Sequence, residues 1–350
     1  MKLWGRNYTQ AELHRYFGHM MPAAGIRRFT FDEGRAKGLS AVEVKTGAGL
    51  RFVVLLDKAL DIGDCDWRGI PIALRTQVGE VAPQYYDPTG DEWFRSFGGG
   101  LLTTCGLTHL GAPDVDQGTS LGLHGRIHNT PGEEVGVKSA WEGGKYVLRI
   151  WGKVREAKTL TGSLCLHREI TAFGGENRII VQDTVVNESF VKMPHMILYH
   201  CNVGHPLLDE GAELVADSLE VRPRDAVAAQ EFSTYQIYKG PTRGYPDTVF
   251  YHKLRPSCDG MTSAVLLNRR LDLGLAVRWD PRNLPNFIQW KYTAEGTYGA
   301  GLEPANCLVE GRSRERERGT LVYLAPGETR SYRVELQVGS AAELMGEMIE

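Results

Sequence analysis

Three separate segments of the sequence carry residues that could do acid–base chemistry. The first holds His124 beside a glycine, where we expect the imidazole to project from a loop between strands. The second places His200 and Asn202 two residues apart, and therefore on one face of an apolar strand. The third holds Glu303 before Pro304, and a residue before proline is held near extended geometry. Imidazole and carboxylate groups are the common general acids and bases of enzymes, so all three segments are candidates for catalysis.

Each of these segments also has a structural interpretation. A histidine beside glycine could cap a turn, and a strand histidine could be a core residue bonded to backbone. His124 and His128 are four residues apart, which would suit a metal site on a helix, but the glycine between them argues against a helix. Two histidines and one glutamate could form a zinc triad. The spacing matches no recognised metal, dinucleotide or phosphate motif, so we expect no metal and no cofactor.

Two groups of charged residues invite a functional interpretation and fit a structural one better. Asp57, Asp61, Asp64 and Asp66 do not have the spacing of a calcium loop, so we interpret them as solvated turn acids. The alternating charges of Arg312–Arg318 predict a solvated strand edge or loop.

Composition excludes several classes of protein. The chain has 350 residues, of which 42% are hydrophobic and 24% charged, as is typical of globular proteins. The net charge is −3 with both signs interspersed, which argues against a nucleic-acid partner. No apolar run approaches the roughly 20 residues of a membrane helix, and the N-terminus lacks the apolar region of a signal peptide. The six cysteines form no close pair, so we expect a cytoplasmic protein without disulfides.

The patterning is that of β-strands. Ser331–Val338 alternates between apolar and polar residues throughout, and we expect it to form a hairpin with Leu321–Leu324 across a Pro-Gly turn. Glycine-containing turns predict two more hairpins, Val137–Trp141 with Lys145–Val154 and Leu164–Ala172 with Arg178–Val186.

Helix signals are confined to the two ends of the chain. Thr9–Phe17 and Ser340–Met348 each begin with a capping residue that is followed three positions later by glutamate. No repeat or linker divides the chain. We therefore predict an all-β fold, one large antiparallel β-sandwich with few short peripheral helices. Residues 1–350 are expected to form a single domain in which residues 1–25 are peripheral and partly helical.

The order of the motifs resembles that of the aldose 1-epimerases, or mutarotases, of the galactose mutarotase-like superfamily. The similarity lies in His124 with its glycine, a strand histidine followed by asparagine at His200, a Gly-Leu-Glu-Pro-Ala stretch around Glu303, and a Pro-Gly-Glu-Thr turn before the last strand. Residues 56–63 and 99–107 look like a bacterial branch of that superfamily without an assigned substrate. The resemblance extends over roughly residues 50–340, and the order of the motifs is its specific part.

This resemblance implies a twisted supersandwich with a sugar cleft. It makes Glu303 the general base, His200 the general acid and His124 a neighbour of the sugar, in an enzyme that interconverts anomers of a sugar or sugar acid by ring opening. The pKa of each catalytic group should lie between its ordinary value and neutrality, with the glutamate ionised and the histidine charged. Candidates for substrate contacts are Arg95, Arg126, Asn202, Gln289, Trp290 and Lys291, with Trp290 able to stack on a pyranose face.

Two other classes of function stay open on the sequence. In a sugar or keto-sugar isomerase or epimerase, Glu303 would remove a carbon-bound proton while a histidine or a metal stabilises an enediolate. A non-catalytic carbohydrate-binding module would keep Trp290 and tolerate loss of Glu303 and His200. In all three classes the partner is a small-molecule carbohydrate, and the expected state is a monomer or homodimer.

Overall fold

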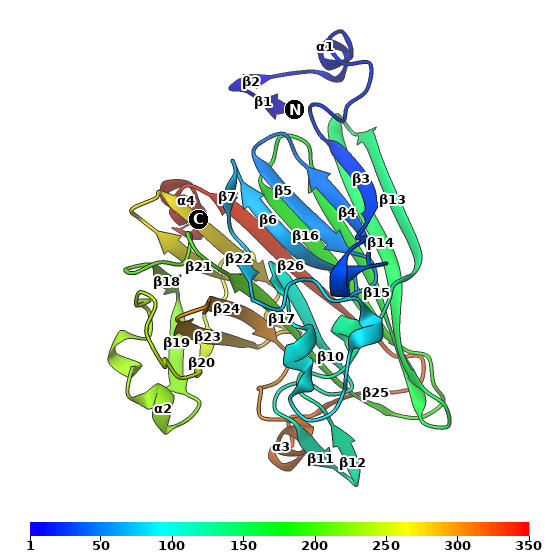
Figure 1. Cartoon of the computed structure of the whole chain (residues 1–350), viewed down its shortest axis with the longest axis vertical. Helices are drawn as coiled ribbons and strands as arrows, with labels where there is room; N and C mark the ends of the chain where they lie inside the picture. The colour runs from blue at the N-terminus through cyan, green and yellow to red at the C-terminus, as the bar shows by residue number, and fades with distance from the viewer. Residues whose placement is uncertain (350) are drawn as a thin grey trace.

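The computed structural model describes residues 1–349, and antiparallel strands dominate it (Figure 1). Within this part of the chain the larger sheet has 12 strands. Its main path runs through β19 (Ser218–Pro223), β20 (Thr248–Leu254), β23 (Asn286–Ala294), β24 (Thr297–Ala305), β17 (Met193–Val203), β10 (Leu102–Leu107), β6 (Asp61–Trp67), β5 (Leu50–Leu55), β4 (Ser40–Lys45) and β3 (Gly25–Thr30). Two short strands join this path, β25 (Val322–Leu324) at β17 and β7 (Ile70–Pro71) at β6.

The second large sheet has 8 strands within the described residues. Their order is β13 (Glu133–Glu142), β14 (Lys145–Lys158), β15 (Gly162–Phe173), β16 (Arg178–Asn187), β26 (Thr329–Gly339), β22 (Leu273–Trp279), β21 (Thr262–Asn268) and β18 (Glu213–Ala216). Small two-stranded sheets are formed by β1 (Lys2–Leu3) with β2 (Arg6–Asn7), β8 (Leu74–Arg75) with β9 (Gly99–Gly100), and β11 (Asp114–Asp116) with β12 (Thr119–Leu121).

Helices are short. The α-helices are α1 (Gln10–His14), α2 (Ala226–Ala229), α3 (Arg312–Arg318) and α4 (Ala341–Ile349). Single 3-10 turns cover Gly34–Ala36, Pro83–Tyr85, Glu92–Ser96, Ile127–Asn129 and Phe232–Thr234. Across residues 1–349, no helix is both long enough and apolar enough to span a bilayer.

Alternation along β17 divides its buried apolar side chains between two apolar clusters. On β17, Ile197 and Tyr199 belong to the large cluster that packs strands of both sheets together. Met196 and Leu198 point the other way, into a second cluster beneath the loops that cover the larger sheet. Because successive strand residues face opposite sides, His200 shares the second face, where a side chain can meet both a sheet and its covering loops.

Several expectations about the fold are confirmed. The architecture is all-β, and β13–β14 and β15–β16 are the two hairpins with glycine-containing turns. Both terminal helices form where expected. Thr9 accepts a hydrogen bond from the Glu12 backbone, and its own backbone donates to the Glu12 carboxylate, so each of the two residues caps the other. The hydroxyl of Ser340 accepts from the Glu343 backbone in the same way.

Two other expectations are wrong. β25 does not pair with β26: the turn at Gly327 forms, but β25 joins β17 while β26 inserts between β16 and β22. Arg312–Arg318 is the helix α3 rather than a solvated edge, because the guanidinium of Arg312 is drawn inward by Asp116, with Nε 2.6 Å from the carboxylate. Both outcomes depend on contacts with residues distant in the sequence, and these contacts cannot be predicted from the local pattern of apolar and polar residues.

Candidate active site

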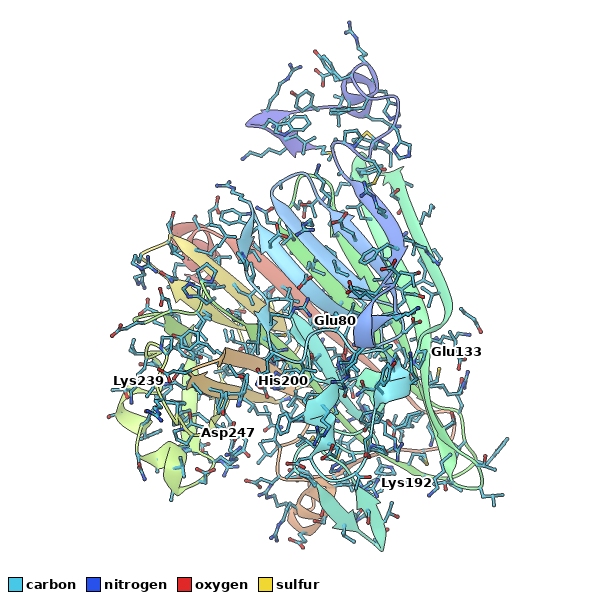
Figure 2. All side chains as sticks on the ribbon, in the orientation of Figure 1. Glu80, Glu133, Lys192, His200, Lys239 and Asp247 are labelled. Carbon is cyan, nitrogen blue, oxygen red and sulfur yellow. The ribbon has the colours of Figure 1, made fainter. Side chains whose placement is uncertain are left out.

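A cleft of about 600 Å³ lies on the face of the larger sheet that points away from the smaller one. Strands β17, β20, β23 and β24 form its floor, and the segments around residues 76–78, 91–97, 111–113 and 123–124 form its walls. His200 lies near the middle of the molecule and Asp247 below it in the view of Figure 2. His124, His200, Glu303 and Trp290 all line the cleft, so the structure brings together the three expected catalytic residues.

His200 and Glu303 are neighbours across two paired strands. The β17–β24 register matches Leu198 with Ala305 and Cys201 with Leu302, which sets His200 opposite Glu303. The Nε2 atom of His200 lies 3.1 Å from Oε1 of Glu303, and both side chains are buried. The two groups are close but not aligned as a hydrogen bond, because within the described residues Oε1 of Glu303 has no hydrogen-bond partner.

Gly301 makes room for the pair. A Cβ atom at this position would lie 2.1 Å from Oε1 of Glu303 and 3.1 Å from Cε1 of His200. Gly301 is two residues before Glu303 and lies on the same face of β24. Its partner on the neighbouring strand β23 is Trp290. A side chain here would therefore push the carboxylate out of reach of the imidazole.

His124 approaches the pair from a loop rather than from the sheet. Its backbone has a φ of 56°, which is a left-handed conformation. The N–H of His124 donates to the carbonyl of Gly111, and the carbonyl of His124 accepts from the N–H of Gly106. The His124 and His200 rings are 5.9 Å apart and nearly perpendicular. Within the described residues Nδ1 of His124 has no hydrogen-bond partner.

Aromatic rings form the walls of the cleft. Trp93 stacks on Phe97 with ring centres 4.7 Å apart, and the ring of His124 lies 4.8 Å from that of Trp93. Trp290 packs against His200 at 5.4 Å and stacks parallel to Tyr292. Flat apolar surfaces beside a polar floor suit a sugar ring, which has apolar C–H faces and polar edges.

Burial governs the protonation of the pair. It lowers the pKa of His200 to about 3. Burial also raises the pKa of Glu303 well above its ordinary value, with a further rise from Asp247 that Arg224 opposes. The expected charged histidine is therefore wrong for the unliganded protein, because removing water from both groups disfavours both charges. Burial therefore favours the neutral form of each group, a protonated carboxyl group on Glu303 and an uncharged imidazole on His200.

Two polar residues of the cleft were missed by sequence analysis. Asp247 accepts a hydrogen bond from Nε1 of Trp290 at 2.5 Å, and Arg224 donates to Asp247 and Asp225 at 2.8 Å each. Both cleft residues, Arg224 and Asp247, come from the irregular segment between β19 and β20, where patterning is weakest. No sequence signal marks them, since their position depends on how this segment folds over the sheet.

Of the six expected substrate contacts, only Trp290 lines the cleft among the described residues. Gln289 and Lys291 flank it on β23 and so face the opposite side, where they bind the 235–238 segment through Tyr235 and Ile237 carbonyls. Asn202 shares the face of His200 but is fully buried and donates to the His200 carbonyl.

The remaining two expected contacts are the arginines. Arg95 is exposed and forms an ion pair with Glu92 on its own 3-10 turn, and Arg126 is an exposed residue that also lies outside the lining. Long charged side chains at a surface gain more from water than from an aromatic-walled cleft.

A buried ionic network lies beside the site. Asp61, expected to be a solvated turn acid, is fully buried instead, and this expectation is wrong. Its carboxylate accepts hydrogen bonds from the Thr104 hydroxyl at 2.6 Å, from Arg168 at 2.7 Å and from Nδ1 of His128 at 2.7 Å. Burial opposes ionisation of Asp61, but His128 and Arg168 outweigh it and lower the pKa of the carboxyl. Arg168 also binds Asp183, so the network joins strands of both sheets.

The fold is shared with solved structures of a candidate aldose 1-epimerase, a galactose mutarotase-like protein and a galactose 1-epimerase. A candidate aldose 1-epimerase from Klebsiella pneumoniae subsp. pneumoniae is 25% identical with a TM-score of 0.88, over 93% of this chain and 86% of that chain. A galactose mutarotase-like protein from Clostridium acetobutylicum (12% identity, TM-score 0.61) and a galactose 1-epimerase from Lactobacillus acidophilus (13% identity, TM-score 0.57) each align over 91% of this chain and 99% of their own, and they show the fold alone. The resemblance inferred from the motifs is thereby confirmed.

Sequence comparison gives a family without an assigned activity. No curated protein matches the chain. A family model with the description Domain of unknown function (DUF4432) matches residues 36–338. Since this match spans most of the sequence, the protein belongs to the DUF4432 family, and its fold is that of the galactose mutarotase-like proteins.

Proposed function

We propose that the protein interconverts the anomers of a sugar by acid–base ring opening at His200 and Glu303. The observation that carries this proposal is the 3.1 Å contact between a buried imidazole and a buried carboxyl group in an aromatic-walled cleft. Two such groups can move protons at two oxygen atoms of one substrate without further chemistry. The likeness to a candidate aldose 1-epimerase supports the same reaction class.

The protonation of the pair determines the order of events. Glu303 begins with the proton and gives it to the ring oxygen, while neutral His200 removes the proton of the C1 hydroxyl; the C1–O5 bond breaks and C1 becomes an aldehyde. The pair now consists of a carboxylate and an imidazolium. After rotation about the C1–C2 bond, the ring oxygen attacks the other face of the aldehyde. Glu303 then acts as base towards the ring hydroxyl and His200 as acid towards the carbonyl oxygen. This order differs from the one that the resemblance implies, in which Glu303 is the base at the C1 hydroxyl and His200 the acid.

The charges of the cleft favour a neutral sugar. Among its lining residues in the described part of the chain, Arg224 is the one arginine or lysine, and Asp225 and Asp247 already bind it. Asp91 and Asp247 add negative charge to the walls. A sugar acid or phosphate would have to enter without an unpaired cation to receive it, which costs free energy. Carboxylates do accept hydrogen bonds from sugar hydroxyls.

The proposal is tested by incubating the purified protein with neutral aldoses, ketoses and uronic acids in heavy water. NMR then follows anomer exchange and deuterium at carbon separately. We expect faster exchange between the anomers of at least one neutral aldose, without deuterium at any ring carbon. Deuterium at C1 or C2, or a new ketose, would replace the proposal with an isomerase. Saturable binding without either change would indicate a carbohydrate-binding module.

A further inference from the structure

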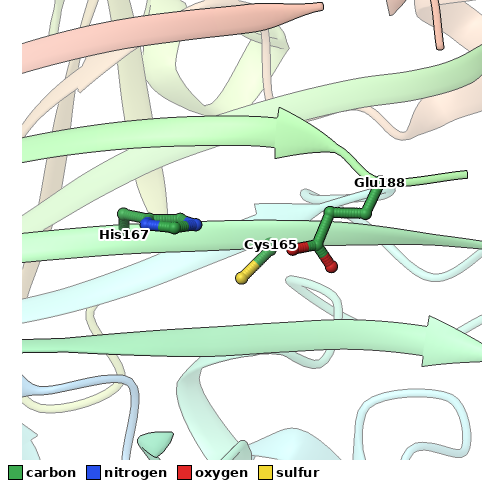
Figure 3. A group of neighbouring side chains, drawn as sticks. All are labelled: Cys165, His167 and Glu188. Atoms are coloured by element: carbon green, nitrogen blue, oxygen red, sulfur yellow. The ribbon is translucent and has the colours of Figure 1, made fainter. Parts of the chain in front are cut away.

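A second group of potential ligands lies outside the cleft, on the smaller sheet. Cys165 and His167 are two residues apart on β15, and the residues that alternate with them, Leu164 and Leu166, face the core between the sheets. The cysteine and histidine therefore share the outer face. Glu188 follows the end of β16, and its backbone donates to Ser163 at the start of β15. Figure 3 shows the three side chains meeting at this point.

We propose that Cys165, His167 and Glu188 form a binding site for a zinc-class divalent metal ion. The sulfur, an imidazole nitrogen and a carboxylate oxygen all lie within 4.8 Å of one another, and this is the one such group of three among the described residues. Zinc takes the same three donor types at about 2.0–2.3 Å in a tetrahedron, so its ligand atoms stand roughly 3.5 Å apart. Side-chain rotations that bring the donors about 1 Å closer would complete three of the four positions and leave one for water.

The protonation states are compatible with a metal. Burial lowers the pKa of His167, and Lys153 and Arg155 lower it further. A neutral imidazole is the form that binds a metal. Burial raises the pKa of the Cys165 thiol, while Arg155 acts in the opposite direction. Metal binding must therefore displace the thiol proton, and affinity should rise with pH.

Arg155 is the residue that competes with a metal. It stands opposite Cys165 in the β14–β15 register, and its guanidinium forms ion pairs with Glu188 and, at 3.6 Å, with Glu133. Binding of a divalent ion would replace the ion pair between Glu188 and Arg155, and Arg155 would then pair with Glu133 alone. The neighbouring Lys153 does not compete in this way, because its ammonium group is 2.7 Å from Glu134.

The test uses the full-length protein and two metals. Zinc binding is measured by calorimetry at pH 6 and pH 8, and Co²⁺ is used as a spectroscopic probe of the ligands. We expect one metal per chain, tighter binding at pH 8, and a thiolate-to-cobalt charge-transfer band. Cys165→Ser and His167→Ala should each weaken binding by at least about tenfold. Arg155→Met should tighten it roughly threefold or more, because a competing cation is removed.

Cys258→Ser is the matched control, since Cys258 is exposed and lies outside the cluster, and it should leave affinity and spectrum unchanged. Circular dichroism checks that each variant folds. The proposal is overturned if the wild-type protein binds no zinc, if the cobalt complex lacks the thiolate band, or if Cys165→Ser binds zinc as tightly as the wild type. The wild-type cobalt spectrum decides the question even if a variant fails to fold. None of these readouts uses a sugar, so the outcome is independent of the proposed reaction.

Discussion

His200 and Glu303 face each other across β17 and β24, with Nε2 of the histidine 3.1 Å from Oε1 of the glutamate. Far apart in the sequence, they meet only because these two strands pair in one register. A slip of one residue would turn one of the two side chains to the opposite face of the sheet. Strand pairing thus builds the acid–base pair, and burial then sets its protonation.

Removing either member of the pair should abolish most of the activity. We expect Glu303→Gln and His200→Asn each to slow anomer exchange by about 10² or more, the usual contribution of one general acid or base. His252→Asn is the control, because His252 is also a buried imidazole but hydrogen-bonds Gln289 and Ser218 outside the cleft. Wild-type exchange rates in either cleft variant would show that the residue is structural.

Gly301→Ala should separate the pair without removing either group. Because the new methyl would overlap Oε1 of Glu303, we expect a loss of kcat of at least about tenfold with a much smaller change in KM. Gly240→Ala is the matched control, since the nearest atom to its added Cβ is an ordinary 3.5 Å away. NMR exchange rates measured over a range of sugar concentrations separate the two constants. Equal rates for Gly301→Ala and wild type would contradict the importance of this contact.

The pH profile should move in opposite directions in two variants. Asp247 raises the pKa of Glu303 and Arg224 lowers it. Asp247→Asn should therefore lower this pKa, so that Glu303 loses its proton, and the enzyme its activity, at a lower pH than in the wild type. Arg224→Gln should move the same loss of activity to higher pH. Measurement of kcat against pH tests both, and shifts in the same direction would exclude Glu303 as the titrating group.

Asp61→Asn should destabilise the protein strongly. The change leaves the buried Arg168 and His128 without the carboxylate that binds both, and breaking a buried ionic pair typically costs about 3–5 kcal/mol. Asp64→Asn on the same strand is the control: Asp64 pairs with Arg75 at the surface, where an ion pair contributes about 0–1 kcal/mol. Urea denaturation of the two variants measures the difference, and similar losses would contradict the role of the network.

Acid should unfold the protein by protonating buried histidines. Burial lowers their pKa values from 6.5 to about 4, and to about 3 for His200, in the group His109, His128, His195, His200 and His252. Below pH 6.5 these histidines become protonated in the unfolded chain, while in the folded chain they stay neutral until the pH approaches 4. The free energy of unfolding therefore falls as pH drops towards 4, by up to about 1.4 kcal/mol per pH unit for each histidine.

Glu303 opposes this trend, because its raised pKa makes the folded state bind a proton more tightly than the unfolded state does. This is the effect of one group, whereas several histidines act in the other direction. Urea denaturation between pH 7 and pH 4 measures the slope. His252→Asn should make it shallower by about one histidine's share. A free energy of unfolding that stays constant over this range would contradict neutral buried histidines.

Features that depend on near neighbours along the chain could be predicted from the sequence. Alternation along Ser331–Val338 marked a strand, glycine turns marked two hairpins, and Thr9 and Ser340 marked the starts of helices. These signals are local because side-chain direction repeats every two residues in a strand, and because a cap bonds to a backbone group three residues away. The types and order of the three candidate catalytic residues were also visible, through the resemblance they carry.

Which groups are buried together depends on the three-dimensional packing of the chain. Asp61 is an unremarkable acid in the sequence, yet it meets Arg168 and His128 in the interior. Asp247 reaches the cleft from an irregular segment, and Gln289 turns away from it although it adjoins Trp290. Each of these outcomes depends on strand pairing and loop packing between residues distant along the chain. Desolvation, which raises the pKa of Glu303, exists only once that packing has removed the water.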